Sequence, residues 1–448
     1  MALFDFPRWK LTSPAAESGV VAPDERLSAG QTLVMGVQHA VAMFGATVLM
    51  PLLMGLDPNL SILMSGVGTL LFFVVTGGRV PSYLGSSFAF LSPVFLVLAQ
   101  YSYEAALGGF IVVGIVFCLV GLLIRAVGTG WIDVIFPPAS MGAIVAVIGL
   151  ELMPTAAGMA GLTGDKTDST AIFVSLATLA ITIFASVAFK GFLSIIPILI
   201  GVVSGYIIAA CTGIVDWSLV ERASWFALPT FYHPVFEPGA ILIILPASLV
   251  VIAEHIGHLI VTGNIVGRDL TKDPGLDRSI LGNGISTIIS GFFGSTPNTT
   301  YGENIGVLAI TRVFSTWVIG GAAVFAILLS CLGKLAALIQ SIPTPVMGGV
   351  SLLLFGLIAA SGIRILVEAK VDYNQPMNLL LTSIVLGIGV STASITLGTV
   401  TLKGMALATV VAIVLSLLFR VIALLRGEPF APAGQGAADA AERHGQQS

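Results

Sequence analysis

Two acidic residues and a histidine stand inside apolar stretches of the sequence, where charge is rare. Glu254 and His258 lie in the run ASLVVIAEHIGHLIVTGNIV, and Glu303 lies in the polar segment GSTPNTTYGENIGV between apolar flanks. An acidic residue in the middle of a membrane span costs about 2.5–3.5 kcal/mol on insertion scales, so such residues usually serve a function. The four-residue spacing places Glu254 and His258 on the same face of a helix.

The chemistry that these groups can perform is proton exchange coupled to binding. Burial away from fixed cations favours the neutral form of a carboxyl group. A protonated carboxyl both donates and accepts hydrogen bonds, whereas a carboxylate only accepts them. A substrate that needs both kinds of bond therefore binds best to the protonated site, and binding becomes linked to proton uptake. Such linkage is what a proton symporter requires.

Each group also has a simpler interpretation. Glu254 and His258 can be a structural pair between helices, and Glu303 can be a hydrogen-bonded carboxyl in a kinked segment. His39 in the first apolar run is either a structural hydrogen-bonding residue or part of a proton path. His255 points about 100° away from Glu254 around the helix, so we expect it to face another surface. The order EHIGH fits neither the zinc-protease nor the di-iron motif, and the sequence predicts no metal site and no catalytic residue.

The composition explains why these polar groups stand out. Hydrophobic residues make up 56% of the 448 residues and charged residues only 9%, and the mean hydropathy is +1.02. Apolar runs of about twenty residues recur, each long enough to cross about 30 Å of hydrocarbon as a helix. We therefore expect an all-α polytopic membrane protein that is not an enzyme. The net charge of −4 comes without a basic patch, which argues against nucleic acid as a partner.

Fourteen membrane segments are predicted from the apolar runs. They span residues 31–55, 59–77, 82–97, 103–127, 131–152, 170–189, 192–212, 239–263, 279–293, 298–311, 313–333, 337–363, 376–393 and 404–424. With both termini in the cytoplasm, 15 of the 19 Lys and Arg residues fall on the cytoplasmic side, as the positive-inside rule expects.

An odd number of segments in each half makes the second half run opposite to the first, which is the layout of an inverted repeat. The first repeat spans 31–212 and the second 239–424, with an extracytoplasmic loop at 213–238 between them. We expect a cytoplasmic N-terminal arm at 1–30 and a disordered cytoplasmic tail at 425–448.

The third segment of each half departs from the pattern of a continuous helix. Both SYLGSSFAFLSP (82–93) and TPNTTYGENIGV (296–307) mix Gly, Ser, Thr and Pro with aromatic residues. Proline and glycine interrupt helices. Irregular backbone at membrane depth is tolerated only where it is buried in protein or lines a wet cavity. Two such segments at matching places indicate a central binding site.

At these residues the sequence resembles the nucleobase–ascorbate transporters, also called the nucleobase:cation symporter-2 family. The run ENIGVLAITR (303–312) fits the family signature of Gln, Glu or Pro, then Asn-x-Gly, four residues, Thr and a basic or small residue. The pair QH in the first segment and AEHIGH in the eighth fit as well. From about Ser82 onward the chain is similar to the uracil-transporting bacterial members, and its first part is similar to a member that serves pyrimidine utilisation.

This resemblance implies fourteen segments sorted into a core domain and a gate domain, each drawn from both repeats. Segments 3 and 10 would be short strand–helix elements that meet at the centre. It also implies a homodimer in the bacterial inner membrane that imports uracil with a proton by alternating access, without a cofactor. The alternatives are a broader nucleobase permease that also takes thymine, xanthine or urate, and an anion transporter or channel, which would need a basic residue in place of Glu303.

The resemblance further implies roles for individual residues. The substrate-binding residues would be Glu254, Glu303, Phe88, Gly302, His258 and Tyr301, with His258 and Tyr301 supporting the carboxyls. Proton coupling would involve Glu303, Glu254, His258 and His39. The supporting residues would be Ser87, Thr300, Asn304 and Phe355.

One of these residues departs from the family pattern. Phe355 in SLLLFGLIAASG occupies a position where the uracil-transporting members have tyrosine. Loss of that hydroxyl can loosen binding or widen the choice of substrate, and the sequence leaves both outcomes open.

Overall fold

The computed structural model describes residues 6–12, 19–164, 168–397 and 400–427. The tail predicted to be disordered lies, from residue 428 onward, outside the described residues. Among the described helices, eight are long and apolar enough to cross a membrane, and four shorter apolar helices accompany them. The expectation of a mainly helical, polytopic membrane protein is therefore confirmed.

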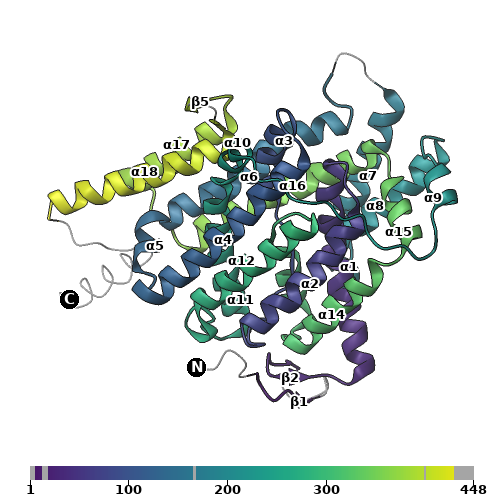
Figure 1. The fold of residues 1–448 in the computed structure, drawn as a ribbon, viewed down its shortest axis with the longest axis horizontal. Helices are drawn as coiled ribbons and strands as arrows, with labels where there is room; N and C mark the ends of the chain where they lie inside the picture. Colours follow the sequence, from purple (N-terminus) through teal and green to yellow (C-terminus); the bar gives the residue numbers. More distant parts are fainter. Residues whose placement is uncertain (1–5, 13–18, 165–167, 398–399, 428–448) are drawn as a thin grey trace.

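By their contacts, the membrane helices form two groups, each of which packs mainly within itself; Figure 1 labels most of these helices. The first group contains α1 (Ala29–Leu53), α2 (Pro58–Val75), α3 (Leu91–Leu98), α4 (Tyr103–Val127), α10 (Pro238–Ile244), α11 (Ala247–Val266), α12 (Leu276–Phe293), α13 (Gly302–Thr311) and α14 (Thr316–Leu329). The second group contains α5 (Gly130–Ile135), α6 (Pro138–Met159), α7 (Ser169–Ala188), α8 (Pro197–Cys211), α16 (Thr344–Glu368), α17 (Pro376–Val390) and α18 (Gly404–Leu425). Two short helices, α9 (Ser218–Arg222) and α15 (Gly333–Gln340), lie in the connections.

Prolines account for the segment boundaries that the sequence misplaced. The segment predicted at 131–152 begins in the wrong place, because Pro137 and Pro138 separate the short α5 from α6, and α6 continues past the predicted end to Met159. Proline at the first helical position lacks only an N–H that would have no partner there, so Pro138 begins α6. In the same way, α16 begins at Thr344 after Pro343, and the segment predicted to start at 337 is divided there.

Small residues allow the longest helices to approach closely within each group. In the second group, a Cβ atom on Gly362 of α16 would lie 2.5 Å from the carbonyl oxygen of Gly142 on α6. In the first group, a Cβ atom on Gly114 of α4 would lie 2.9 Å from the carbonyl oxygen of Gly284 on α12. Such contacts favour association in lipid, where apolar burial alone gives no preference for helix pairing.

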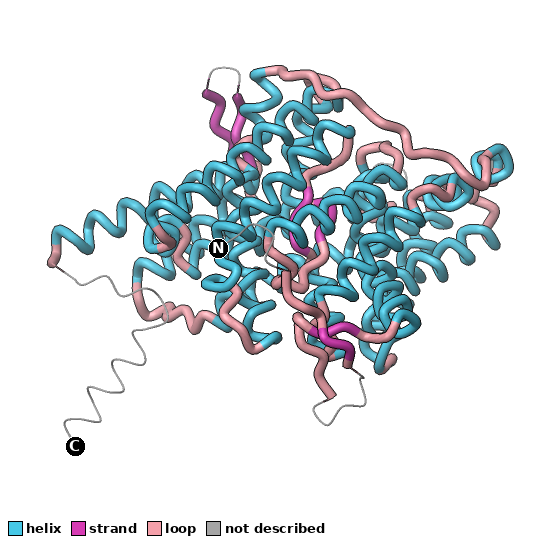
Figure 2. The backbone as a smooth tube through the Cα atoms, turned by 60° about the horizontal axis from the view of Figure 1, so that its bottom comes forward, coloured by secondary structure: helices cyan, strands magenta, loops and turns pink. Residues whose placement is uncertain are grey.

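Two short strands occupy the interior between the helices (Figure 2). β3 (Leu84–Ser86) pairs antiparallel with β4 (Asn298–Thr300), and Gly85 lies opposite Thr299. A 3-10 turn (Phe88–Phe90) leads from β3 into α3, and α13 follows β4. The strands predicted in segments 3 and 10 are therefore confirmed.

Two further pairs of strands lie at opposite ends of the molecule (Figure 1). The hairpin of β5 (Ser394–Leu397) and β6 (Val400–Lys403) precedes α18, and β1 (Lys10–Leu11) pairs in parallel with β2 (Glu25–Arg26) in the N-terminal arm.

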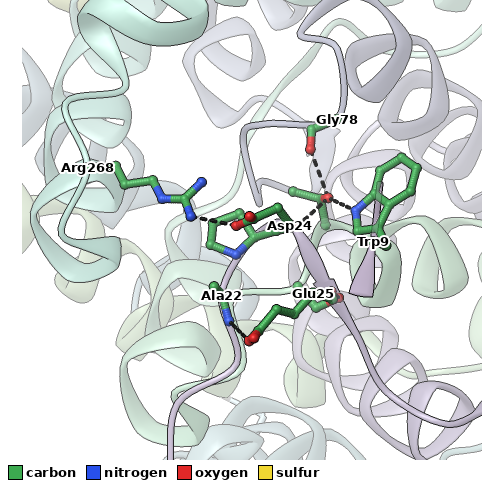
Figure 3. A network of polar contacts seen from close by, with 9 residues as sticks. Trp9, Ala22, Asp24, Glu25, Gly78 and Arg268 are labelled. Carbon is green, nitrogen blue, oxygen red and sulfur yellow. Dashed lines mark hydrogen bonds and ion pairs between the residues drawn. The ribbon is translucent and has the colours of Figure 1, made fainter. Parts of the chain in front are cut away.

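The N-terminal arm is fastened to the first helix group by a network of polar contacts (Figure 3). The indole N–H of Trp9 donates to the hydroxyl of Thr316 at 2.9 Å, and that hydroxyl lies 2.9 Å from the carbonyl oxygens of both Pro23 and Gly78. Thr316 begins α14 and Gly78 follows α2, so one side chain joins the arm to two helices.

The arm also reaches the end of α13, which begins at the central strands. The N–H of Val21 donates to the carbonyl of Arg312 at 3.0 Å, and the N–H of Phe314 donates back to Val21 at 2.7 Å. Asp24 forms an ion pair with Arg268 beyond α11. Partial burial opposes ionisation of Asp24, but the hydrogen bond and charge of Arg268 outweigh it and hold the pKa of Asp24 below its ordinary value.

Replacing the shared hydroxyl tests this attachment. Thr316→Val leaves the Trp9 indole and the Gly78 carbonyl without the hydroxyl, while the Pro23 carbonyl keeps the backbone N–H of Thr316, and the loss costs about 1–3 kcal/mol. We expect tryptic cleavage within the arm of the purified protein to accelerate about tenfold, because cleavage follows the population of the released arm. Thr409→Val is the matched control, because the Thr409 hydroxyl donates only within α18. Equal cleavage rates for both variants would show that Thr316 does not hold the arm.

Candidate functional site

A cavity of about 200 Å³ lies between the two helix groups, against the paired strands. The residues that line it are Ser86, Ser87, Phe88, Val145, Ile148, Ile198, Glu254, His258, Thr299, Thr300, Tyr301, Gly302, Glu303, Leu354, Leu357, Ile358 and Ser361. Every polar lining residue except Ser361 lies in the first group or in the central strands and turns that contact it, and the second group supplies an apolar wall. We call this space the central cavity.

The helical segments that follow β3 and β4 both begin at the central cavity. Phe88 starts the 3-10 turn that leads into α3, and Gly302 and Glu303 are the first residues of α13. All three line the cavity. The first N–H groups of a helix lack partners inside the helix and carry partial positive charge, so they can donate to a bound molecule.

Two carboxyl groups from different elements face this cavity. Glu254 comes from the middle of α11, and Glu303 comes from the first turn of α13. The Oε2 atom of Glu254 is buried and has no hydrogen-bond partner among the described residues. A buried polar atom without a partner is costly, and a molecule bound in the cavity could supply the missing bond.

His258 connects α11 to the central strands. Its Nδ1 atom lies 2.8 Å from the carbonyl oxygen of Thr300, which is the partner of a protonated Nδ1. Neutral imidazole then leaves Nε2 as an acceptor, and Nε2 lies 3.6 Å from the place that a Cβ atom on Gly302 would occupy. His258 shares the cavity with Glu254, but its hydrogen bonds go to Thr300 and not to the carboxyl.

The side chain of Tyr301 packs against β3 and connects it to α1. Its hydroxyl donates to the carbonyl oxygen of Ser86 at 3.2 Å and accepts from Thr47 of α1 at 3.3 Å. Its ring lies over Gly85, where a Cβ atom would come 2.5 Å from the ring edge. Glycine at position 85 is therefore what lets the ring cover the strand.

Three expected site residues, His39, Asn304 and Phe355, lie outside the cavity lining. His39 is buried on α1, where its ring nitrogen Nδ1 and its carbonyl oxygen both lie 3.1 Å from the side-chain nitrogen of Asn304. Phe355 is fully buried and meets Phe88 edge to face at 5.9 Å between ring centroids. His39 therefore contacts α13, the helix that carries Glu303, and Phe355 contacts Phe88, which lines the cavity.

His255 faces away from the cavity, as its helical phase predicts. Its Nε2 atom lies 2.6 Å from the hydroxyl of Ser279 on α12, and its ring meets Phe72 edge to face. It holds helices of the first group together.

The sequence did not predict nine of the lining residues, which are two polar strand residues, Ser361 on α16 and six apolar residues. Ser86 and Thr299 lie in the strands themselves, and their place in the two irregular segments was a signal that could have identified them. The apolar wall comprises Val145, Ile148, Ile198, Leu354, Leu357 and Ile358. Nothing distinguishes these residues from other apolar positions of their helices, because only the packing of the second group against the first selects them.

The fold and this cavity are those of a polytopic membrane protein with a small polar site at its centre. The sequence model of the Permease family matches residues 30–398, and the chain belongs to this family. The resemblance seen in the sequence is thereby confirmed.

Three permeases align with this chain along almost their entire length. The chain is 62% identical to the uracil permease of Paenibacillus larvae over 413 residues, covering 91% of this chain and 98% of the relative. It is 62% identical to the uracil permease of Escherichia coli over 411 residues, covering 91% and 96%. It is 46% identical to the putative pyrimidine permease RutG of Escherichia coli over 431 residues, covering 93% and 96%.

Solved structures share the fold at low sequence identity. The structure of SLC26A9 superposes with a TM-score of 0.65 at 13% identity, covering 87% of this chain and 65% of that one. The transmembrane domain of the cyanobacterial bicarbonate transporter BicA superposes with a TM-score of 0.57 at 16% identity, covering 88% and 96%. These likenesses concern the fold alone.

A methyl group at position 85 tests whether Tyr301 needs the glycine. Gly85→Ala crowds the Tyr301 ring, and such overpacking costs about 1–3 kcal/mol. We expect a lower apparent unfolding temperature of the purified protein. Gly320→Ala is the matched control, since a Cβ atom there meets nothing within 4 Å. If the two variants unfold at the same temperature, the close approach of Tyr301 is not important for stability.

Proposed function

We propose that the protein is a uracil–proton symporter that carries uracil through the central cavity by alternating access. The observation that carries this proposal is the presence of two carboxyl groups, Glu254 and Glu303, on one small cavity beside two helix beginnings. The uracil permeases that are 62% identical to the chain support uracil as the substrate.

Uracil fits the chemistry of this cavity. It is neutral, flat and small, and its N–H and C=O groups alternate along one edge. Glu254 and Glu303 can accept from the N–H groups, and a protonated carboxyl can also donate to a carbonyl oxygen. Backbone N–H groups near Phe88 and Gly302 can donate to the same edge, and the Phe88 ring can stack on the face of the base.

Proton coupling follows from the difference between the two states of these carboxyls. A protonated carboxyl completes the hydrogen bonds of the substrate, so uracil and a proton bind together and leave together. His258 stays tied to Thr300 and offers its second ring nitrogen toward the beginning of α13. His39 lies one residue away, behind Asn304, and we propose that it takes part through that contact.

The architecture that we propose is fourteen segments in two inverted repeats of seven. The first helix group corresponds to the core domain and the second to the gate domain, and each draws helices from both halves of the chain. Both termini lie in the cytoplasm, which the bias of basic residues supports. We further propose a homodimer in the bacterial inner membrane.

Anion transport is the alternative that the structural neighbours raise, since BicA is a bicarbonate transporter. The two helix beginnings offer only partial positive charge, and the carboxyls of Glu254 and Glu303 on the same cavity would repel an anion unless a basic side chain balanced them. None of the described residues that line the central cavity is a lysine or an arginine, and two are glutamates. The cavity therefore favours a neutral substrate.

Uptake into proteoliposomes tests the proposed function directly. Labelled uracil would be followed with and without an inward proton gradient, in the presence of excess thymine, xanthine or urate. We expect accumulation that depends on the gradient and is inhibited by unlabelled uracil but not by the purines. Competition by xanthine or urate would establish a broader permease, and Phe355 behind Phe88 is then the first residue to change. Absence of uracil uptake would refute the proposal.

A glutamine at position 303 tests proton coupling. Glu303→Gln keeps the shape of the side chain and removes its titratable proton, so we expect gradient-driven accumulation to be lost. Glu368→Gln is the matched control, because Glu368 lies at the exposed end of α16 and pairs with Arg364. Full uphill uptake by Glu303→Gln would exclude this carboxyl as the coupling group.

A further inference from the structure

A second cavity, of about 410 Å³, lies beside the central cavity along the same two helical elements. On α6, Ile148 lines the central cavity and Glu151 lines the second one. In the first group, Phe88 lines the central cavity and Ser92 lines the second one. On both sides, only three to four residues separate a residue that lines the central cavity from one that lines the second cavity.

A hydrogen bond crosses between the helix groups at two of these residues. The hydroxyl of Ser92 on α3 donates to the Oε1 atom of Glu151 on α6 at 2.7 Å. α3 belongs to the first group and α6 to the second. The bond therefore joins the groups about one helical turn from Ile148, which lines the central cavity.

Glu151 is itself fixed within the second group. Its other oxygen accepts from the backbone N–H of Met405 at 2.9 Å, in the first turn of α18. Lys403, at the start of the same helix, lines the second cavity with Glu151. Hydrogen bonds to a carboxylate are stronger than those between neutral groups. When the groups separate, the bond from Ser92 must break while the bond to α18 can remain.

We propose that Ser92 and Glu151 form a latch that closes the central cavity toward the second cavity. This inference rests on the proposed function, because it assigns to these residues one closed state of alternating access. The second cavity is then the vestibule on the side of the β5–β6 hairpin, which the distribution of basic residues places outside the cell. Opening the latch connects that vestibule to Glu254 and Glu303.

The test measures access to the central cavity from outside the cell. The native thiols of Cys118, Cys211 and Cys331 are replaced by serine, and a thiol is introduced by Ile148→Cys in the buried lining of the central cavity. Intact cells are treated with a membrane-impermeant maleimide. We expect Ser92→Ala to accelerate labelling of this thiol about tenfold or more, because the loss of one charge-assisted bond shifts the equilibrium toward the open state.

Three further variants make the result specific. Ser92→Thr keeps the hydroxyl, so labelling should stay at the slow parental rate. Ser416→Ala removes a buried hydroxyl that donates only within α18, and it should also leave the rate unchanged. Glu151→Asp shortens the side chain and moves its carboxylate away from Ser92, so it should accelerate labelling as Ser92→Ala does. If Ser92→Ala does not reach the membrane, Glu151→Asp replaces it in the test.

The outcomes separate the latch from the proposed function. Equal labelling rates in Ser92→Ala, Glu151→Asp and the parent, or equal acceleration in Ser416→Ala, would overturn the latch. Uracil uptake is measured in separate cells whose protein keeps the native Ile148, Ser92 and Glu151, because Ile148 lines the central cavity. Uptake with an unchanged labelling rate rejects the latch alone, whereas accelerated labelling without any uracil uptake rejects uracil as the substrate and keeps the latch.

Discussion

The pairing of β3 with β4 is the interaction on which the rest of the structure depends. Backbone N–H and C=O groups inside a membrane protein must find partners within the protein. Three residues from each half of the chain supply one another's partners here, and the bonds from Tyr301 to Tyr83 and from Ser87 to Pro297 extend the ladder. The side-chain nitrogen of Asn298, which has two hydrogens to donate, lies within hydrogen-bond distance of the Met64 carbonyl and of the Ser286 and Ser290 hydroxyls, and it fixes the pair to α2 and α12.

This pairing makes a polar site possible in an apolar environment. Because each strand is followed by a helix, two helix beginnings reach the same place, and Glu303 enters the cavity at one of them. Glu254 and His258 approach from α11, one turn apart, and the bond from His258 to Thr300 holds α11 against β4. The site is thus assembled around the paired strands, and the second group contributes a mainly apolar wall.

The polar contacts of the first group are of two kinds, those within the group and those that reach the second group. The N-terminal arm, through Trp9 and Thr316, ties together elements within the group on the side opposite the β5–β6 hairpin. Ser92 instead bonds across the groups to Glu151. Contacts of the first kind keep the group rigid, while a contact of the second kind has to break if the groups move relative to each other.

The sequence by itself determined the class of protein, the two interrupted segments and the pair of intramembrane carboxyls. These features are local, because composition, proline and glycine positions, and a charge within an apolar run do not depend on distant residues. Only the tertiary structure decided which apolar residues wall the cavity, that His258 bonds to Thr300 and not to Glu254, and that Ser92 meets Glu151. Those pairings join segments 42 and 59 positions apart in the chain, and the packing of whole helices, which no local pattern encodes, brings them together.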